Sequence, residues 1–176
     1  EEPLRTSLPA LTQPSLYLVT PDCKGDTRSF LLGISRALEA GVTRLQLRVR
    51  SLQGAPLEAL ALAVKQRCDP VGAQLLVNGD VGLAARIGCG VHLRAPQLMA
   101  LSARPLPESL PVAASCHDAI ELMQAQELGL DFAVLGPVSR TPGHAAPIGW
   151  RGFAELREAV SLPIYGLGGL GRDDLA

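Results

Sequence analysis

Polar and basic side chains follow the second apolar run of the chain at alternate positions. Gln46, Arg48 and Arg50 are separated by Leu47 and Val49. In an extended segment, side chains two residues apart point to the same side. Guanidinium groups hold carboxylate and phosphate oxygens through paired hydrogen bonds. The spacing therefore favours an anion-binding edge, and an ion pair between Arg48 and an acidic neighbour is the alternative.

Two further apolar runs end in polar residues. Asn78 follows the third run and precedes Gly79, whereas Ser115 and His117 follow the fifth run. Asn-Gly is also ordinary turn chemistry, and serine is a residue type that caps helices. These three polar residues are therefore candidate ligand-binding residues, and a purely structural role stays open for each.

A long loop with no helical or strand pattern follows the sixth apolar run, from about 136 to 149. It contains Thr141 and His144. Loops of this length usually carry function or are disordered. An imidazole in a loop can donate to phosphate or move protons near neutral pH, so we take His144, and after it His117, as catalytic candidates. His92 lies within an apolar strand pattern, and we interpret it as structural.

Glycines cluster after the seventh apolar run, in the segment from 166 to 171. Gly168 and Gly169 stand at the start of a further expected helix. Glycines let backbone amides approach an anion, and a helix N-terminus adds positive potential. We therefore expect a phosphate site at these two glycines, and an ordinary turn is the alternative.

Short apolar runs alternate with segments of helical spacing along the whole chain. The runs predict strands at 16–19, 43–47, 75–77, 90–93, 112–114, 132–135 and 164–167. Helices are expected between them, at about 30–41, 57–68, 81–87, near 98, at 118–128 and at 153–160. Strands joined by helices run parallel in a sheet that is covered on both faces. The pattern predicts an α/β fold.

We expect this fold to be a (βα)8 TIM barrel whose last strand and helix are absent from the chain. Ligands of such barrels bind at the carboxyl ends of the strands, where the polar residues above would meet. An open doubly wound sheet is the alternative. The first fourteen residues contain three prolines and no periodicity, so we divide the chain into a linker, 1–14, and a barrel domain, 15–176.

Composition narrows the possible partners. The 176 residues are 47% hydrophobic, which suffices for one core, and 16 basic residues balance 17 acidic residues for a net charge of -1. This balance excludes the basic footprint of a nucleic-acid-binding protein. The chain has neither an apolar run long enough to span a membrane nor a signal-peptide pattern. Its four cysteines form no C-x-x-C pair, so we expect reduced thiols and a cytoplasmic protein.

Taken in order, these motifs resemble the thiamine phosphate synthase and TenI family. The resemblance rests on Tyr17 to Asp22, Gln46-x-Arg48-x-Arg50, Val77-Asn78, Gly90 to Leu93, Ser115-x-His117, Gly136-Pro137-Val138 and Gly168-Gly169. It implies a small (βα)8 barrel of thiamine biosynthesis that is usually dimeric. The synthase joins a hydroxymethylpyrimidine pyrophosphate to a thiazole phosphate, and Mg²⁺ supports the departure of pyrophosphate.

The resemblance also assigns roles to individual residues. Positions that hold the pyrimidine pyrophosphate match Gln46, Arg48 and Asn78, positions that line the same site match Ser115 and Thr141, and the thiazole phosphate site matches Gly168 and Gly169. A small phosphorylated molecule is therefore the expected ligand.

Several residues depart from the family pattern. Gly79 and Gln97 stand where the synthase has metal-binding aspartates, so we expect no metal site. Arg50 replaces a lysine, which keeps the charge and changes its geometry. In the Thr-x-Thr-Lys segment only the first threonine is kept, with Gly143 and His144 at the last two positions.

This chain also departs from the tautomerase branch of the family, because the position of that branch's proton-transferring histidine is occupied by Pro137 here. Three hypotheses remain. The chain is a divergent synthase or tautomerase that uses His144 or His117, a non-catalytic ligand-binding module, or the C-terminal domain of a Nudix hydrolase fusion. The proline-rich leader and the missing first methionine favour the Nudix context, although no Nudix box lies within these residues.

Overall fold

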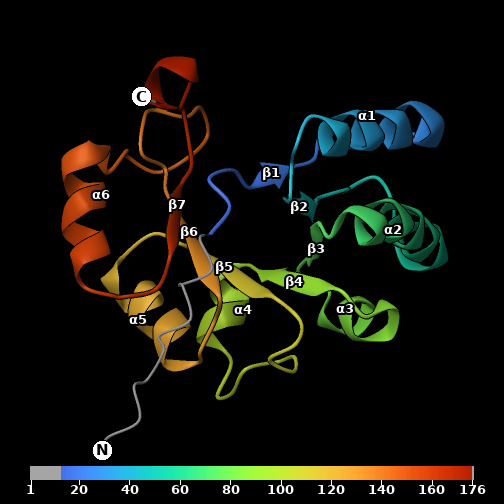
Figure 1. Ribbon diagram of the computed structural model, residues 1–176. Helices are drawn as coiled ribbons and strands as arrows, with labels where there is room; N and C mark the ends of the chain where they lie inside the picture. Colours follow the sequence, from blue (N-terminus) through green and yellow to red (C-terminus); the bar gives the residue numbers. More distant parts are fainter. Residues whose placement is uncertain (1–12, 176) are drawn as a thin grey trace, which may run out of the picture.

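A single sheet of seven parallel strands organises the computed structural model, which describes residues 13–175. The strands are β1 (Leu18–Val19), β2 (Arg44–Leu47), β3 (Gln74–Asn78), β4 (Gly90–Leu93), β5 (Val112–Cys116), β6 (Phe132–Leu135) and β7 (Ile164–Gly166). Each pairs with the next in chain order, and the sheet curls into a half-barrel (Figure 1). A doubly wound sheet reverses its strand order part-way, so the sequential order excludes that alternative.

Helices connect the strands and lie outside the curled sheet (Figure 1). They are α1 (Thr27–Glu39), α2 (Gly54–Cys68), α3 (Val81–Ile87), α4 (Ala95–Met99), α5 (Ala119–Glu127) and α6 (Gly149–Glu158). Single 3₁₀ turns at Asp69–Val71 and Arg172–Leu175 follow α2 and the glycine segment. None of the helices in 13–175 has the length and apolar character of a membrane span.

Aspartates fix the starts of three helices. The carboxylates of Asp26, Asp80 and Asp118 accept hydrogen bonds from backbone amides three residues later, at the N-termini of α1, α3 and α5. Such caps stabilise a helix by about 0.5–2 kcal/mol. Because Asp118 caps α5, Ser115 is not needed as a cap, and its side chain is available to the site described below.

Strand side chains alternate between two apolar clusters. Leu45 and Leu47 pack outward against the helices, in the larger core cluster. Leu76, Ala113 and Phe132 form a smaller cluster on the concave side. β2, β4 and β6 are buried at every residue, as expected for parallel strands covered on both faces.

Arg44 closes the lower end of the concave side. Its guanidinium lies 4.2 Å from the ring centroid of Phe132 and donates to Gln74 Oε1 and to the Tyr165 hydroxyl, both at 2.8 Å. The same group donates to Gln13 Oε1 at 2.8 Å. The last part of the expected linker therefore packs against the sheet, and residues 1–12 lie outside the described residues.

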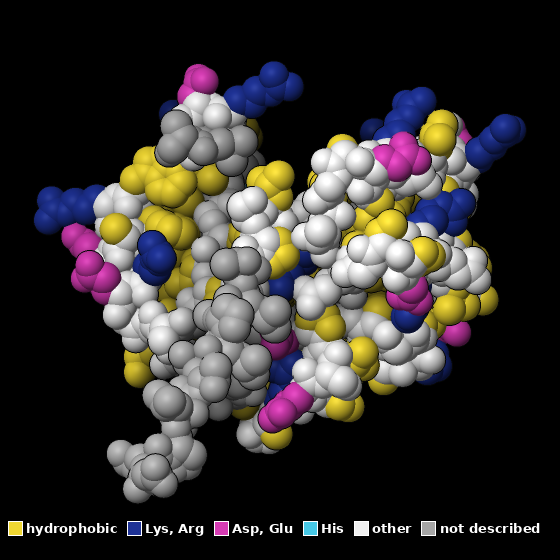
Figure 2. Space-filling model, viewed as in Figure 1, with side chains coloured by type: hydrophobic (Ala, Val, Ile, Leu, Met, Phe, Trp, Pro, Cys, Tyr) yellow, Lys and Arg dark blue, Asp and Glu magenta, His cyan; other side chains and the backbone are white. Residues whose placement is uncertain are grey.

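The C-terminal end differs most from the expected elements. The seventh expected helix is a 3₁₀ turn of four residues, and Leu16 of the first expected strand is exposed outside the sheet. No residue of α6 is buried, and Figure 2 shows apolar side chains gathered over this helix. Trp150 on α6 is 47% exposed and no residue of β7 is buried, so the β7–α6 edge of the sheet is only partly covered.

Candidate functional site

A cavity of about 690 Å³ lies at the carboxyl ends of the strands. Nine of the ten predicted site residues line it: Gln46, Arg48, Arg50, Asn78, Ser115, His117, Thr141, His144 and Gly168. Gly169 does not line the cavity. Residues that lie up to 122 positions apart in the sequence, from Gln46 to Gly168, therefore meet around one space, as the parallel-strand argument predicts.

Positive charge dominates the cavity wall. Arg48, Arg50 and Arg94 line it together with three histidines, and none of its described lining residues is an aspartate or a glutamate. No described carboxylate forms an ion pair with Arg48, which excludes the alternative raised for that residue. Burial, and secondarily repulsion from Arg50, lowers the pKa of Arg48. The cavity thus favours anions.

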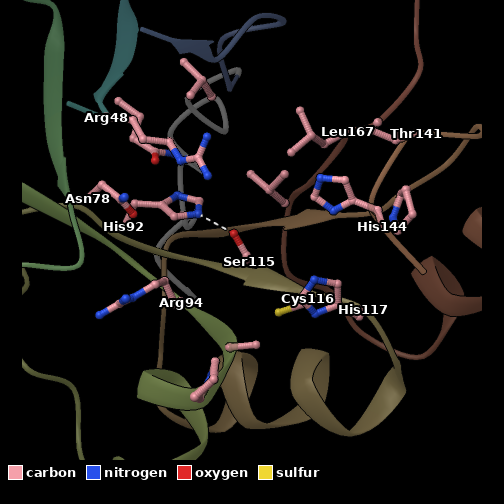
Figure 3. Close-up of a pocket in the computed structure, with 18 of the residues that line it drawn as sticks. Arg48, Asn78, His92, Arg94, Ser115, Cys116, His117, Thr141, His144 and Leu167 are labelled. Carbon is pink, nitrogen blue, oxygen red and sulfur yellow. Dashed lines mark hydrogen bonds between the residues drawn. The ribbon is translucent and has the colours of Figure 1, made fainter. Parts of the chain in front are cut away.

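His92 belongs to the cavity wall, a role that the sequence interpretation missed. Its Nε2 lies 2.8 Å from Ser115 Oγ and its Nδ1 lies 3.1 Å from the Tyr17 hydroxyl (Figure 3). Burial, with a smaller contribution from Arg48, lowers the pKa of His92 to about 4, so the ring is neutral near pH 7. Its position between Val91 and Leu93 was the available signal, because alternation turns His92 to the concave side.

Hydrogen bonds reach both ring nitrogens of this imidazole. Gln46 Nε2 donates to the Tyr17 hydroxyl oxygen at 3.4 Å. Tyr17 thereby links Gln46 to His92 Nδ1, and which atom of the Tyr17–His92 pair donates depends on the tautomer of the ring. Among the described residues Ser115 Oγ is hydrogen-bonded to His92 Nε2 alone, so its remaining hydrogen-bonding capacity is available to a ligand.

The two catalytic candidates lie across the cavity from Arg48. Figure 3 shows His117 and His144 on the side of Thr141 and Leu167. His117 Nδ1 lies 3.0 Å from Oε2 of Glu121, in the first turn of α5. This contact orients the ring of His117, whereas His144 lies in the loop with its backbone amide bonded to the Thr141 carbonyl.

The long loop after β6 pairs with the glycine segment after β7. Val138 and Ser139 donate backbone hydrogen bonds to the carbonyls of Leu167 and Gly168, both at 2.9 Å. A Cβ at Gly169 would lie 2.8 Å from the carbonyl oxygen of Arg140, and the φ of Gly169 is +64°. This glycine therefore permits the close approach of the loop, which is the reason for its absence from the cavity wall.

The expected helix N-terminus at the glycines is corrected by the structure. The 3₁₀ turn of four residues is too short for a developed helix dipole, and Asp174 Oδ2 already accepts from the Gly171 amide at 2.7 Å. Gly168 lines the cavity, and its amide and that of Gly169 donate to no described residue. Any phosphate contact here therefore depends on these two amides and not on a helix start.

The family model for thiamine monophosphate synthase matches residues 16–176. This chain belongs to that family. A putative thiamine-phosphate synthase of Geobacter sulfurreducens is 36% identical over 161 residues, which cover 89% of this chain and 76% of the relative. The thiamine-phosphate synthase of Thioalkalivibrio sulfidiphilus is 33% identical over 168 residues, which cover 92% of this chain and 79% of that relative.

Solved structures share the fold of this thiamine monophosphate synthase family member. A thiamine phosphate pyrophosphorylase from Pyrococcus furiosus superposes with a TM-score of 0.75 at 23% identity, covering 90% of this chain and 76% of that protein. A second thiamine phosphate pyrophosphorylase, from Bacteroides thetaiotaomicron, superposes with a TM-score of 0.62 at 17% identity, covering 90% of this chain and 74% of that protein. At these identities the likeness concerns the fold.

The magnesium positions implied by the family resemblance do not fit a metal in this member. Gln97 Nε2 donates to the Gly79 carbonyl at 2.8 Å, and Gln97 Oε1 accepts from Arg94 N at 3.0 Å and Arg94 Nε at 3.2 Å. Both ends of the Gln97 amide are therefore occupied. No group of three potential metal ligands exists among residues 13–175. Mg²⁺ prefers carboxylate oxygens, and these two positions supply none.

Proposed function

We propose that the cavity binds the phosphorylated small molecules of the thiamine phosphate synthase reaction, at the carboxyl ends of the strands. The observation that carries this proposal is the carboxylate-free wall with three arginines, in a chain of this family. Charged hydrogen bonds from guanidinium groups to phosphate contribute roughly 1.5–3 kcal/mol each where they are shielded from water.

The proposed pyrophosphate side comprises Gln46, Arg48, Arg50 and Asn78, on β2, β3 and the loop after β2. The proposed thiazole phosphate side comprises Thr141 and Gly168, with His144 beside them. Figure 3 shows Arg48 and Asn78 on one side of the His92–Ser115 pair and Thr141 and His144 on the other. Two ligands placed in this way would face each other across Ser115, which suits a reaction that joins them.

Joining the two molecules would displace pyrophosphate, so negative charge would grow on the departing group. Preorganised cations next to a developing charge lower the barrier to such a step. Arg48 and Arg50 are the residues on the proposed departure side. His117 and His144 are the proposed catalytic residues on the other side, where an imidazole can donate a hydrogen bond to the phosphate of the second ligand.

Calorimetry with the thiazole phosphate and with the corresponding thiazole alcohol tests the proposal. We expect the phosphate to bind at least about tenfold more tightly, a difference of about 1.4 kcal/mol. Arg48→Ala is expected to weaken the binding of inorganic pyrophosphate, whereas Arg36→Ala, on the exposed side of α1, leaves it unchanged. Equal affinities for the phosphate and the alcohol, together with no pyrophosphate binding, would contradict the proposal.

A non-catalytic ligand-binding domain is the second candidate function. Gly79 and Gln97 at the metal positions and Pro137 at the tautomerase position favour it, because each removes a group on which a known family activity depends. Product formation, measured under the conditions of the binding experiment, separates the two candidates. Tight binding of both substrates without turnover would support the second.

Three further features are proposed from the sequence resemblance. An eighth strand would close the half-barrel, and the exposed edge at β7 and α6 supports this extension. A homodimer in the cytoplasm is proposed from the family. An upstream Nudix domain in the same polypeptide stays a prediction, which the residues preceding Glu1 would test.

A further inference from the structure

Arg94 lies beside Gly79 and Gln97, the two positions at which the family resemblance implies magnesium-binding aspartates in the synthases. A Cβ at Gly79 would lie 3.2 Å from Gln97 Oε1 and 3.5 Å from Arg94 Nε. A carboxylate at position 79 would therefore project into the space that the Gln97 amide and the Arg94 guanidinium fill. The part of the cavity wall that would hold a metal ion in a relative therefore carries the Arg94 guanidinium in this chain.

Local hydrogen bonds hold Arg94 in this place. Its backbone amide and its Nε both donate to Gln97 Oε1, and Gln97 Nε2 donates to the Gly79 carbonyl. Gln97 thus ties the end of β4 to the end of β3. The parallel register, which pairs Asn78 with His92, sets Arg94 and Gly79 side by side beyond the strand ends.

The terminal nitrogens of Arg94 remain for a ligand. Nε is bonded within the cluster, and neither terminal nitrogen contacts a carboxylate among the described residues. Figure 3 shows the side chain running along the wall on the Asn78 side, away from Ser115. Figure 3 shows Arg48 on this same side, and Arg50 also lines the cavity. An aspartate at position 79 would pair with Arg94, so glycine there leaves its charge unneutralised.

We infer that Arg94 takes the place of the divalent cation in this chain, so that the cavity binds a diphosphate through guanidinium groups without metal. Three guanidinium groups against no carboxylate suit a ligand with several negative charges better than a monoester. Planar guanidinium forks match phosphate oxygens bidentately. The inference rests on the proposed function and names the diphosphate as the group that this side of the cavity recognises.

Titration of sodium pyrophosphate into the protein, once with EDTA and once with excess Mg²⁺, tests this inference. The wild-type protein is expected to bind in EDTA at least as tightly as in Mg²⁺, because magnesium would neutralise the ligand that the arginines recognise. Arg94→Ala should weaken binding in EDTA about tenfold, an effect that shrinks as salt screens the charges. Arg94→Lys keeps the positive charge but lacks the planar guanidinium, so its pyrophosphate affinity in EDTA should lie between those of the wild type and Arg94→Ala.

Matched controls keep the outcomes distinct. Arg36→Ala removes an exposed arginine of α1 that does not line the cavity and should change nothing. Thermal unfolding of each variant checks that the fold is retained. Binding that requires Mg²⁺, or an Arg94→Ala affinity in EDTA equal to that of the wild type, would overturn the inference and leave the proposed function standing. No pyrophosphate binding in either buffer, with no preference for the thiazole phosphate, would overturn both.

Discussion

Restoring two aspartates at the metal positions tests how this cavity handles charge. The double variant Gly79→Asp/Gln97→Asp supplies the carboxylates that the family resemblance implies, yet leaves Arg94 between them. We expect the new carboxylates to pair with Arg94 and to give only a weak dependence on Mg²⁺. The triple variant that also carries Arg94→Gly should bind Mg²⁺ and show pyrophosphate affinity and product formation that increase with the metal.

The structure sets the stability cost of this change. Gly79 has a φ of +72°, where a non-glycine residue is strained by roughly 1–2 kcal/mol and aspartate is among the better tolerated types. Loss of the three Gln97 hydrogen bonds costs about 0.5–1.5 kcal/mol each when they are buried, and less at this half-buried site. An Asp–Arg pair at the surface returns about 0–1 kcal/mol. We therefore expect the double variant to lose about 2–4 kcal/mol.

Thermal unfolding and calorimetry measure the two effects separately. At about 2–4 °C of Tm per kcal/mol for a chain of this size, the double variant should unfold roughly 4–16 °C below the wild type. The ratio of pyrophosphate Kd values in EDTA and in Mg²⁺ then reports metal use in each variant. Equal and strong Mg²⁺ dependence in the double and triple variants would refute the argument that Arg94 occupies the metal position. Robust Mg²⁺-dependent synthesis by the wild type would refute the whole assignment of the metal positions.

Three further predictions concern residues in the cavity wall or next to it. Burial lowers the pKa of His92 from its ordinary 6.5 to about 4. As the pH falls from about 6.5 to 4, His92 is therefore protonated in the unfolded chain while it stays neutral in the folded protein. The free energy of unfolding should therefore drop by up to about 3 kcal/mol over that range in urea titrations, and His92→Asn should remove this part of the loss. Tyr17→Phe deletes the hydroxyl that is hydrogen-bonded to His92 Nδ1 and should cost about 1 kcal/mol of stability by denaturant unfolding, with unchanged stability contradicting the assigned hydrogen bond. Gly169→Val should displace the 136–149 loop and abolish the calorimetric preference for the thiazole phosphate, whereas Gly171→Val, at a glycine without a positive φ where an added Cβ would meet no atom within 4 Å, should retain that preference.

Which residues line the cavity could be predicted where local pattern alone decides it. Gln46, Arg48 and Arg50 share one side because their spacing is two, and all three line the cavity. The alternation of apolar runs and helical segments also predicted the order of all seven strands. The length of the last helix was less well predicted. The turn after the glycines is a 3₁₀ turn in which Asp174 accepts from the Gly171 amide, and hydrophobic periodicity in the sequence does not reveal such a contact.

The roles of His92, Gly169 and Arg94 depended on contacts between distant segments. The sequence by itself determined the α/β class, the element order and the family, since propensity, hydrophobic period and motif order are properties of neighbouring residues. Only the tertiary structure decided that His92 bonds to Tyr17 and Ser115, that Gly169 lies against Arg140, and that Arg94 adjoins Gly79. The physical reason is strand register: which side chains meet across neighbouring strands depends on how each strand is aligned with the next, and that alignment is fixed by packing of the whole sheet.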